Sequence, residues 1–142
     1  ALIIGLNRLN SILHLDHRMH TAHVQAGVIN AWLNQAADPF RLFYAPDPSS
    51  QSACTIGGNI AENAGGIHCL KYGVTVDHVL GLTWVTPHGE VVPIGGRHRR
   101  GHGLNLTGLL VGSEGTLGIV TEATLQLLMK PTNVVVVLAS FT

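Results

Sequence analysis

The sequence predicts an α+β fold, a mostly antiparallel sheet flanked by helices. Three observations predict it: about seven segments have strand character, roughly two or three have helical spacing, and tight turns join several neighbouring strands. Tight turns favour antiparallel pairing, and the regular strand–helix alternation of a dinucleotide-binding Rossmann domain is missing. A length of 142 residues suits one domain with a single hydrophobic core.

The first part of the chain carries three predicted strands and one helix. The apolar run Ala1 to Gly5 and the segment Ser11 to Leu15 are predicted strands on either side of a turn. Thr21 to Gln25 alternates polar and apolar residues, which is the period of a half-buried strand. Val28 to Ala37 has helical spacing before a proline, and an apolar run from Phe40 to Tyr44 follows.

The rest of the chain carries the longer predicted strands. A brief helix is expected from Asn59 to Ala64, and one or two helical turns from Leu104 to Val111. A hairpin turn is expected at Pro87-His88-Gly89. The remaining segments share alternation or β-branched residues and are predicted strands: Thr75 to Thr86, Glu90 to Ile94, Ile119 to Leu128 and Val134 to Val137.

Composition argues against several classes of function. Eight basic and eight acidic residues give no net charge, which argues against a nucleic-acid surface, and the basic run Arg97 to Arg100 is expected to be a solvated loop. Cys54 and Cys69 lack any C-x-x-C spacing, so two reduced thiols in a cytosolic protein are expected. No signal peptide is visible, and the longest apolar run, Val134 to Ala139, is too short to cross a bilayer.

Common catalytic and metal-binding motifs are missing from the sequence. There is no P-loop, no Rossmann fingerprint, and no nucleophile elbow, because Ser113 stands one place too early between its glycines. His14, His17, His20 and His23 recur every third residue, but the segment around His23 is predicted as a strand and would not gather them on a helix face. We expect no metal site and no catalytic residue in this chain.

Two stretches of small residues remain. The first runs from Pro46 to Gly66 and the second from Gly112 to Val120. Glycines add no buried area but let a ligand approach the main chain closely, so two such loops favour holding a cofactor over performing chemistry. The alternative is a pair of ordinary glycine-rich turns that bind nothing.

These stretches resemble the FAD-binding, PCMH-type domain of the vanillyl-alcohol-oxidase superfamily. The resemblance rests on PDPSS at 46–50, CTIGGN at 54–59, NAGG at 63–66 and GSEGTLGIVTE at 112–122. The further segment GIHCLKYG at 66–73 resembles FAD-linked 2-hydroxyacid oxidases of the glycolate oxidase type, with D-lactate dehydrogenases close behind.

The resemblance implies that FAD is the cofactor and that both loops contact it. The first loop and its continuation would run along the flavin and its phosphates, while the second would meet the ribose and adenine. The residues implied to bind FAD are Pro48, Ser49, Ser50, Cys54, Thr55, Ile56, Gly57, Gly58, Asn59, Glu62, Asn63, Ala64, Gly65, Gly66, Glu114, Gly115, Gly118, Ile119 and Val120.

The resemblance also implies a wider enzyme. Residues 1–142 would form part of the FAD-binding domain, its larger lobe, and the pyrophosphate-loop lobe and substrate domain would lie outside them. The chain opens without Met inside an apolar run, so we expect a fragment. Because the pyrophosphate loop would lie outside it, we expect this fragment to bind FAD weakly or not at all when alone. The parent enzyme would oxidise a small 2-hydroxy acid, bound outside this chain, to a 2-oxo acid.

Partners and location follow from the same resemblance. Other subunits of an oxidase complex are implied, in the cytoplasm or peripheral to the inner membrane through those subunits. Two alternatives stay open: a non-catalytic binding module built on the same lobe, and a histidine-based metal protein.

Overall fold

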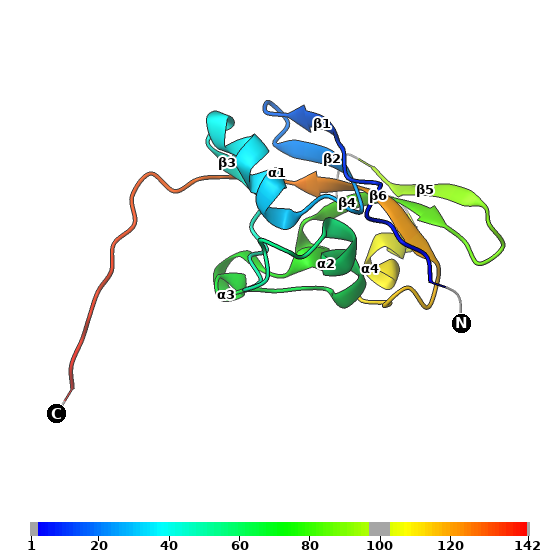
Figure 1. The fold of residues 1–142 in the computed structure, drawn as a ribbon. Helices are drawn as coiled ribbons and strands as arrows, with labels where there is room; N and C mark the ends of the chain where they lie inside the picture. Colours follow the sequence, from blue (N-terminus) through cyan, green and yellow to red (C-terminus); the bar gives the residue numbers. More distant parts are fainter. Residues whose placement is uncertain (1–2, 97–102, 142) are drawn as a thin grey trace.

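The structure is a computed structural model that describes residues 3–96 and 103–141. A five-stranded antiparallel sheet forms its centre, in the order β1-β2-β6-β4-β5 (Figure 1). The strands are β1 (Ile12–Asp16), β2 (Thr21–Gln25), β4 (Val79–Val85), β5 (Val91–Gly95) and β6 (Ile119–Gln126). The predicted α+β class with antiparallel pairing is therefore confirmed.

A second, two-stranded sheet pairs β3 (Leu42–Phe43) with β7 (Leu128–Met129). It ties the chain leaving the helix α1 (Asn30–Ala37) to the chain leaving β6. The other helices are α2 (Ile56–Glu62), α3 (Cys69–Tyr72) and α4 (Leu106–Leu110), with 3-10 turns η1 (Asp38–Phe40) and η2 (Thr75–Asp77). Figure 1 shows α2 and α4 side by side beneath the sheet.

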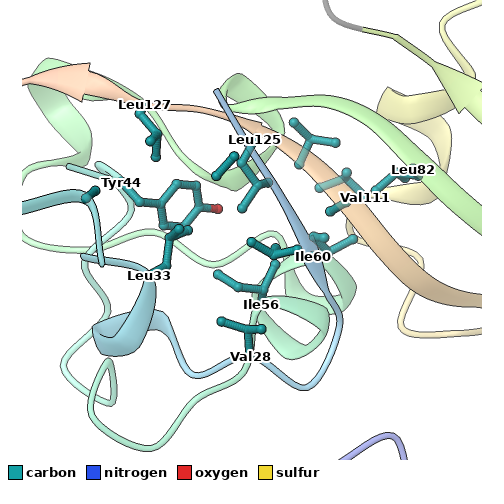
Figure 2. Packing of buried hydrophobic residues seen from close by; sticks show 14 of the residues in the cluster. Val28, Leu33, Tyr44, Ile56, Ile60, Leu82, Val111, Leu125 and Leu127 are labelled. Atoms are coloured by element: carbon teal, nitrogen blue, oxygen red, sulfur yellow. The ribbon is translucent and has the colours of Figure 1, made fainter. Parts of the chain in front are cut away.

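The core lies between the sheet and these helices. Ala22 and Val24 on β2, and Ala123 and Leu125 on β6, are fully buried and alternate with less buried residues, as the two-residue period of a strand requires. Figure 2 shows how the side chains of α1 and α2 meet those of the strands around the ring of Tyr44. The labelled members of this cluster are Val28, Leu33, Tyr44, Ile56, Ile60, Leu82, Val111, Leu125 and Leu127.

Two predicted strands are wrong. Ile3 to Gly5 form no strand, and Ile3 is 91% exposed; Ala1 and Leu2 lie outside the described residues. Val134 to Val137 are extended but unpaired, at least 80% exposed, and run away from the body (Figure 1). β-Branched residues favour an extended backbone, but a strand also needs a neighbour to receive its hydrogen bonds.

Several predicted elements are present with different ends. Helix α1 starts at Asn30 rather than Val28, because Val28 O accepts from Ile56 N (2.8 Å) and Ile29 bridges Thr55 in extended conformation. The segment predicted as one strand from Thr75 begins as the turn η2. The strand predicted to run to Leu128 divides into β6 and β7.

The brief helix predicted from Asn59 to Ala64 is α2, which starts at Ile56 and so takes both glycines into its first turn. The sequence does not predict the helix α3. The basic run Arg97 to Arg100 lies outside the described residues.

Candidate cofactor-binding site

The two small-residue loops meet on α2. At the carboxyl end of this helix, Ile60 O accepts a hydrogen bond from Gly112 N (2.8 Å) and Ala61 O accepts one from Glu114 N (3.0 Å). Helix carbonyls in the last turn have no partner within the helix, so they are free to hold another segment. The second loop is therefore fixed against the helix that the first loop opens.

A hollow of about 190 Å³ lies where the loops meet. Its wall comes from α2, from the second loop and start of β6, and from the segment before β1. The residues predicted for the cofactor that line it are Gly57, Glu114, Gly115, Gly118, Ile119 and Val120. The remaining lining residues, which the sequence does not indicate, are Ile4, Leu6, Ile60, Ala61, Leu110 and Ser113.

The first loop is carried by the amino end of α1. Asn30 N donates to Cys54 O (3.0 Å) and Ala31 N to Gln51 O (3.0 Å), so carbonyls of the loop satisfy the unpaired donors of the helix. The predicted residues Pro48 and Ser50 close two tight turns, with their carbonyls accepting from Gln51 N and from Ala53 N. Ser49 and Ser50 are exposed, with side chains open to solvent or a ligand.

The first turn of α2 has no spare main-chain donor among its opening residues. Ile56 N donates to Val28 O (2.8 Å), Gly57 N to Ala26 O (2.7 Å), and Gly58 N to the Thr55 hydroxyl (3.1 Å), which caps the helix. The Ile56 side chain is fully buried in the core. Thr55 and Ile56 thus hold the loop in place. Gly57 lines the hollow, and it is glycine because a Cβ atom there would meet Ala26 at 2.9 Å.

The carboxyl end of α2 does offer free donors. In the part of the chain that the structure describes, the main-chain N–H groups of Gly65 and Gly66 donate to no protein acceptor. Asn59 is only 2% exposed, and its Nδ2 also has no partner there. Buried donors normally have an acceptor, so the buried Nδ2 of Asn59 fits an acceptor on a ligand such as a flavin or a phosphate. Gly65 and Gly66 are half-buried, so their N–H groups are accessible to the same ligand. The residues present therefore fit the cofactor that the sequence implies.

Neighbouring predicted residues have structural partners. Asn63 ends α2 with a φ of 51°, and its side-chain oxygen accepts from Val76 N (2.9 Å). Ala64 O accepts from both the main chain and the hydroxyl of Thr75, at 3.0 and 2.7 Å. Glu62 is exposed beside them. These contacts fix the chain on both sides of the free donors.

The second loop is shaped by Gly118, whose φ is 137°. This backbone conformation favours glycine. A Cβ atom here would also collide with the indole nitrogen of Trp84 and with Val85 O. The loop can therefore lie against β4 only with glycine at this position.

The histidines among the described residues do not gather into a metal site. His23 on β2 contacts Thr124 and Glu122 across the sheet, at 3.0 and 3.1 Å, while the His17 ring stacks on Phe40. Among the residues described, no group of three or more His, Cys, Asp or Glu side chains could hold a metal ion. Nor does any described helix combine the length and apolarity needed to traverse a bilayer.

Comparison with known proteins gives the same fold and related sequences. The glycolate oxidase subunit GlcD of Escherichia coli (strain K12) is 48% identical over 141 residues, which are 99% of this chain and 28% of that protein. The D-lactate dehydrogenase of Anaerostipes hadrus is 42% identical over 136 residues, which are 95% of this chain and 28% of that protein. A solved structure of alkyldihydroxyacetonephosphate synthase matches with a TM-score of 0.76 and 33% identity, over 89% of this chain and 23% of that one.

The fold and the paired loops define a flavin-binding domain. A family model described as FAD binding domain matches residues 1–95, and the chain belongs to this family, whose cofactor is FAD. The resemblance to FAD domains of the vanillyl-alcohol-oxidase type is confirmed. The chain spans about 28% of the length of the curated relatives named above.

Proposed function

We propose that the chain holds FAD within an oxidoreductase that converts a 2-hydroxy acid, of the glycolate or D-lactate type, to a 2-oxo acid. The observation that carries the proposal is the attachment of both small-residue loops to one helix, through Gly112 N to Ile60 O and Glu114 N to Ala61 O. Relatives named as a glycolate oxidase subunit and a D-lactate dehydrogenase support the class of substrate.

Within this proposal the nineteen residues predicted from the sequence divide by role. Gly65, Gly66 and Asn59 donate hydrogen bonds to the cofactor, while Gly115, where an added Cβ would meet only Gly118 O at 3.9 Å, lets it approach the main chain. Gly57 and Gly118 line the site and are glycine because Ala26 and Trp84 lie against them. The exposed hydroxyls of Ser49 and Ser50 are further donors at the rim. FAD, when bound, supplies the group that accepts a hydride from the substrate, and the protein orients it.

We further propose that residues 1–142 are the larger lobe of the FAD-binding domain. Ile4, which lines the hollow, is 57% exposed, and the apolar side chains Leu106 and Leu109 on α4 are 41% and 61% exposed. A second lobe would cover these side chains and complete the cofactor site. Substrate-binding and catalytic groups, and contacts to other oxidase subunits in the cytoplasm or at the inner membrane, are assigned to sequence outside this lobe.

The proposal is tested on the full-length protein. FAD is titrated and followed by flavin fluorescence, and the loaded protein is then mixed anaerobically with glycolate, D-lactate or L-lactate. We expect stoichiometric binding and loss of the visible flavin absorbance with glycolate or D-lactate. Bound flavin that no 2-hydroxy acid reduces would favour the non-catalytic module, and failure to bind FAD would reject the proposal.

Residues 1–142 purified alone provide a second test, of the lobe assignment. With one wall of the site, they are expected to bind FAD much more weakly than the full-length protein. A yellow, stoichiometric complex of this segment would contradict the assignment.

A further inference from the structure

A contact between a carboxylate and an imidazole joins the start of the first small-residue stretch to the residues just after its end. The carboxylate of Asp47 lies just before Pro48, and it accepts from the ring nitrogen Nδ1 and from the main-chain N–H of His68, the latter at 3.4 Å. His68 follows Gly66 by two residues and precedes α3. The contact therefore joins residues 21 positions apart and encloses most of the predicted flavin-binding segment.

Asp47 is the fixed partner in this contact. The two residues before it are buried, and the fully buried Asn30 donates from Nδ2 to Pro46 O (3.0 Å). Asn34, one turn further along α1, accepts from Tyr44 N (2.8 Å). The segment is thus held on α1 at two points, and only 18% of the Asp47 side chain is exposed.

His68 is the more exposed partner. Its side chain is 59% exposed, and its neighbours Ile67 and Leu70 are 87% and 100% exposed, so little packing holds this turn. The Gly66 main chain nevertheless lies directly against Asp47, because a Cβ atom on Gly66 would collide with the main chain and carboxylate of Asp47. The main-chain bonds of the turn stay within residues 66–73, whereas the contact with Asp47 ties the turn to the segment before Pro48.

We propose that the Asp47–His68 pair is a clamp that holds the free N–H groups of Gly65 and Gly66 where they can donate to the flavin. His68 is then a positioning residue for FAD. This inference rests on the proposed function. The donors of Gly65 and Gly66 can meet a ligand acceptor only if the turn stays closed, and preorganised donors cost less to order on binding.

Other charged groups near His68 do not replace the clamp. Lys71 on α3 lies 4.8 Å from the centre of the Tyr72 ring, which is edge-on to Phe43. Lys130 lines a second hollow, together with Asp47 and His68, but it is paired with Asp38. The Lys130–Asp38 pair is therefore a matched control, because it is a surface ion pair between residues that are not predicted to bind FAD.

The test uses His68→Phe, Asp47→Asn and the double variant in the full-length protein, with Asp38→Asn as control. Phe keeps a ring of similar size but cannot donate to the carboxylate. An exposed pair contributes little on its own, so we expect each single variant to weaken FAD binding by about threefold to tenfold, and the double variant to be no worse than the singles. Asp38→Asn should bind FAD like the unaltered protein.

His68→Arg supplies the conservative rescue, because a guanidinium can donate two bonds to one carboxylate. We expect it to restore FAD affinity to within about twofold of the unaltered protein. Equal FAD affinity of the His68→Phe variant and the unaltered protein would overturn the clamp, as would an Asp38→Asn variant that loses as much.

Amide hydrogen exchange without FAD separates the clamp from the proposed function. In His68→Phe, the hydrogen-bonded amides of the turn, Cys69 N on Gly66 O and Tyr72 N on His68 O, should exchange faster, whereas those of α1 should not change. Unchanged exchange at Cys69 and Tyr72 rejects the clamp even if FAD binds well. Faster exchange in a protein that never binds FAD rejects the proposed function and the clamp's role in holding FAD.

Discussion

The indole Nε1–H of Trp84 donates a hydrogen bond to the main-chain carbonyl of Leu117, at 3.1 Å. This contact fastens the second small-residue loop to β4, on the side away from its bonds to α2. The loop is consequently held from two elements that the core already fixes, before any ligand is present.

Replacing Trp84 by Phe should therefore loosen this loop. Loss of one hydrogen bond is expected to lower the free energy of unfolding by about 1 kcal/mol, measured by chemical denaturation, and to weaken FAD binding as well. Trp32, which is 50% exposed on α1, provides the matched substitution to Phe. Equal losses in the two variants would show that the Trp84–Leu117 contact has no special role.

Gly118→Ala should be far more damaging than an ordinary Gly→Ala change. The new Cβ would meet both a strained backbone conformation and two fixed neighbours, so we expect a loss of about 2–4 kcal/mol in the free energy of unfolding. A Cβ atom added to Gly96 would meet no other atom within 4 Å, so Gly96→Ala serves as the control. A Gly118→Ala protein as stable as Gly96→Ala would contradict the described loop.

Asn59→Leu separates stability from binding. Because Nδ2 of this buried side chain has no protein partner among the described residues, its replacement should leave the melting temperature of the FAD-free protein unchanged or higher. The same change removes a donor that we assign to the cofactor, so FAD affinity should fall. Calorimetry and FAD titration measure the two effects; a lower melting temperature with unaltered affinity would refute the assignment.

Tyr44 should make the protein sensitive to alkaline pH. Burial raises the pKa of its phenol above the ordinary value of about 10. Below that value the phenol is neutral in the folded and unfolded chain. Above it the unfolded chain loses the proton first, so the free energy of unfolding should fall by about 1.4 kcal/mol per pH unit until the folded pKa is reached.

The control for this slope is the other tyrosine. Above pH 10, Tyr44→Phe should reduce the loss of unfolding free energy by about 1.4 kcal/mol per pH unit, whereas Tyr72→Phe should leave that loss unchanged. Urea denaturation at a series of alkaline pH values measures the slope. Identical slopes for the unaltered protein and Tyr44→Phe would show that the phenol does not govern it.

The central strands could be predicted because a sheet with one buried face imposes a period of two on the sequence. The alternation over Thr21–Gln25 predicts a strand with the observed ends, and its buried residues Ala22 and Val24 alternate as expected. By contrast, Val134 to Val137 have the composition of a strand but no neighbour, and composition carries no information about a partner. The helix α3 has only four residues and its Leu70 is exposed, so its sequence has no apolar periodicity from which a helix could be predicted.

The candidate site was only partly predictable for a similar reason. Small residues mark where a ligand can approach the main chain, and both marked loops do meet on α2. The contributions of Ile4 and Leu6 to the hollow, and the contact between Asp47 and His68, depend on how distant segments pack. No local pattern in the sequence encodes them.

One short helix, α2, supports both loops, and this has a consequence for how such a protein can change. A shift of α2 on its buried residues Ile56 and Ile60 would move both loops together, the one that we assign to the flavin and the one that we assign to the adenine. Variants in the interior could then alter nucleotide affinity without touching the ligand, and the two loops could not be retuned one at a time. Natural selection for a different FAD affinity would therefore act on core residues as much as on surface residues.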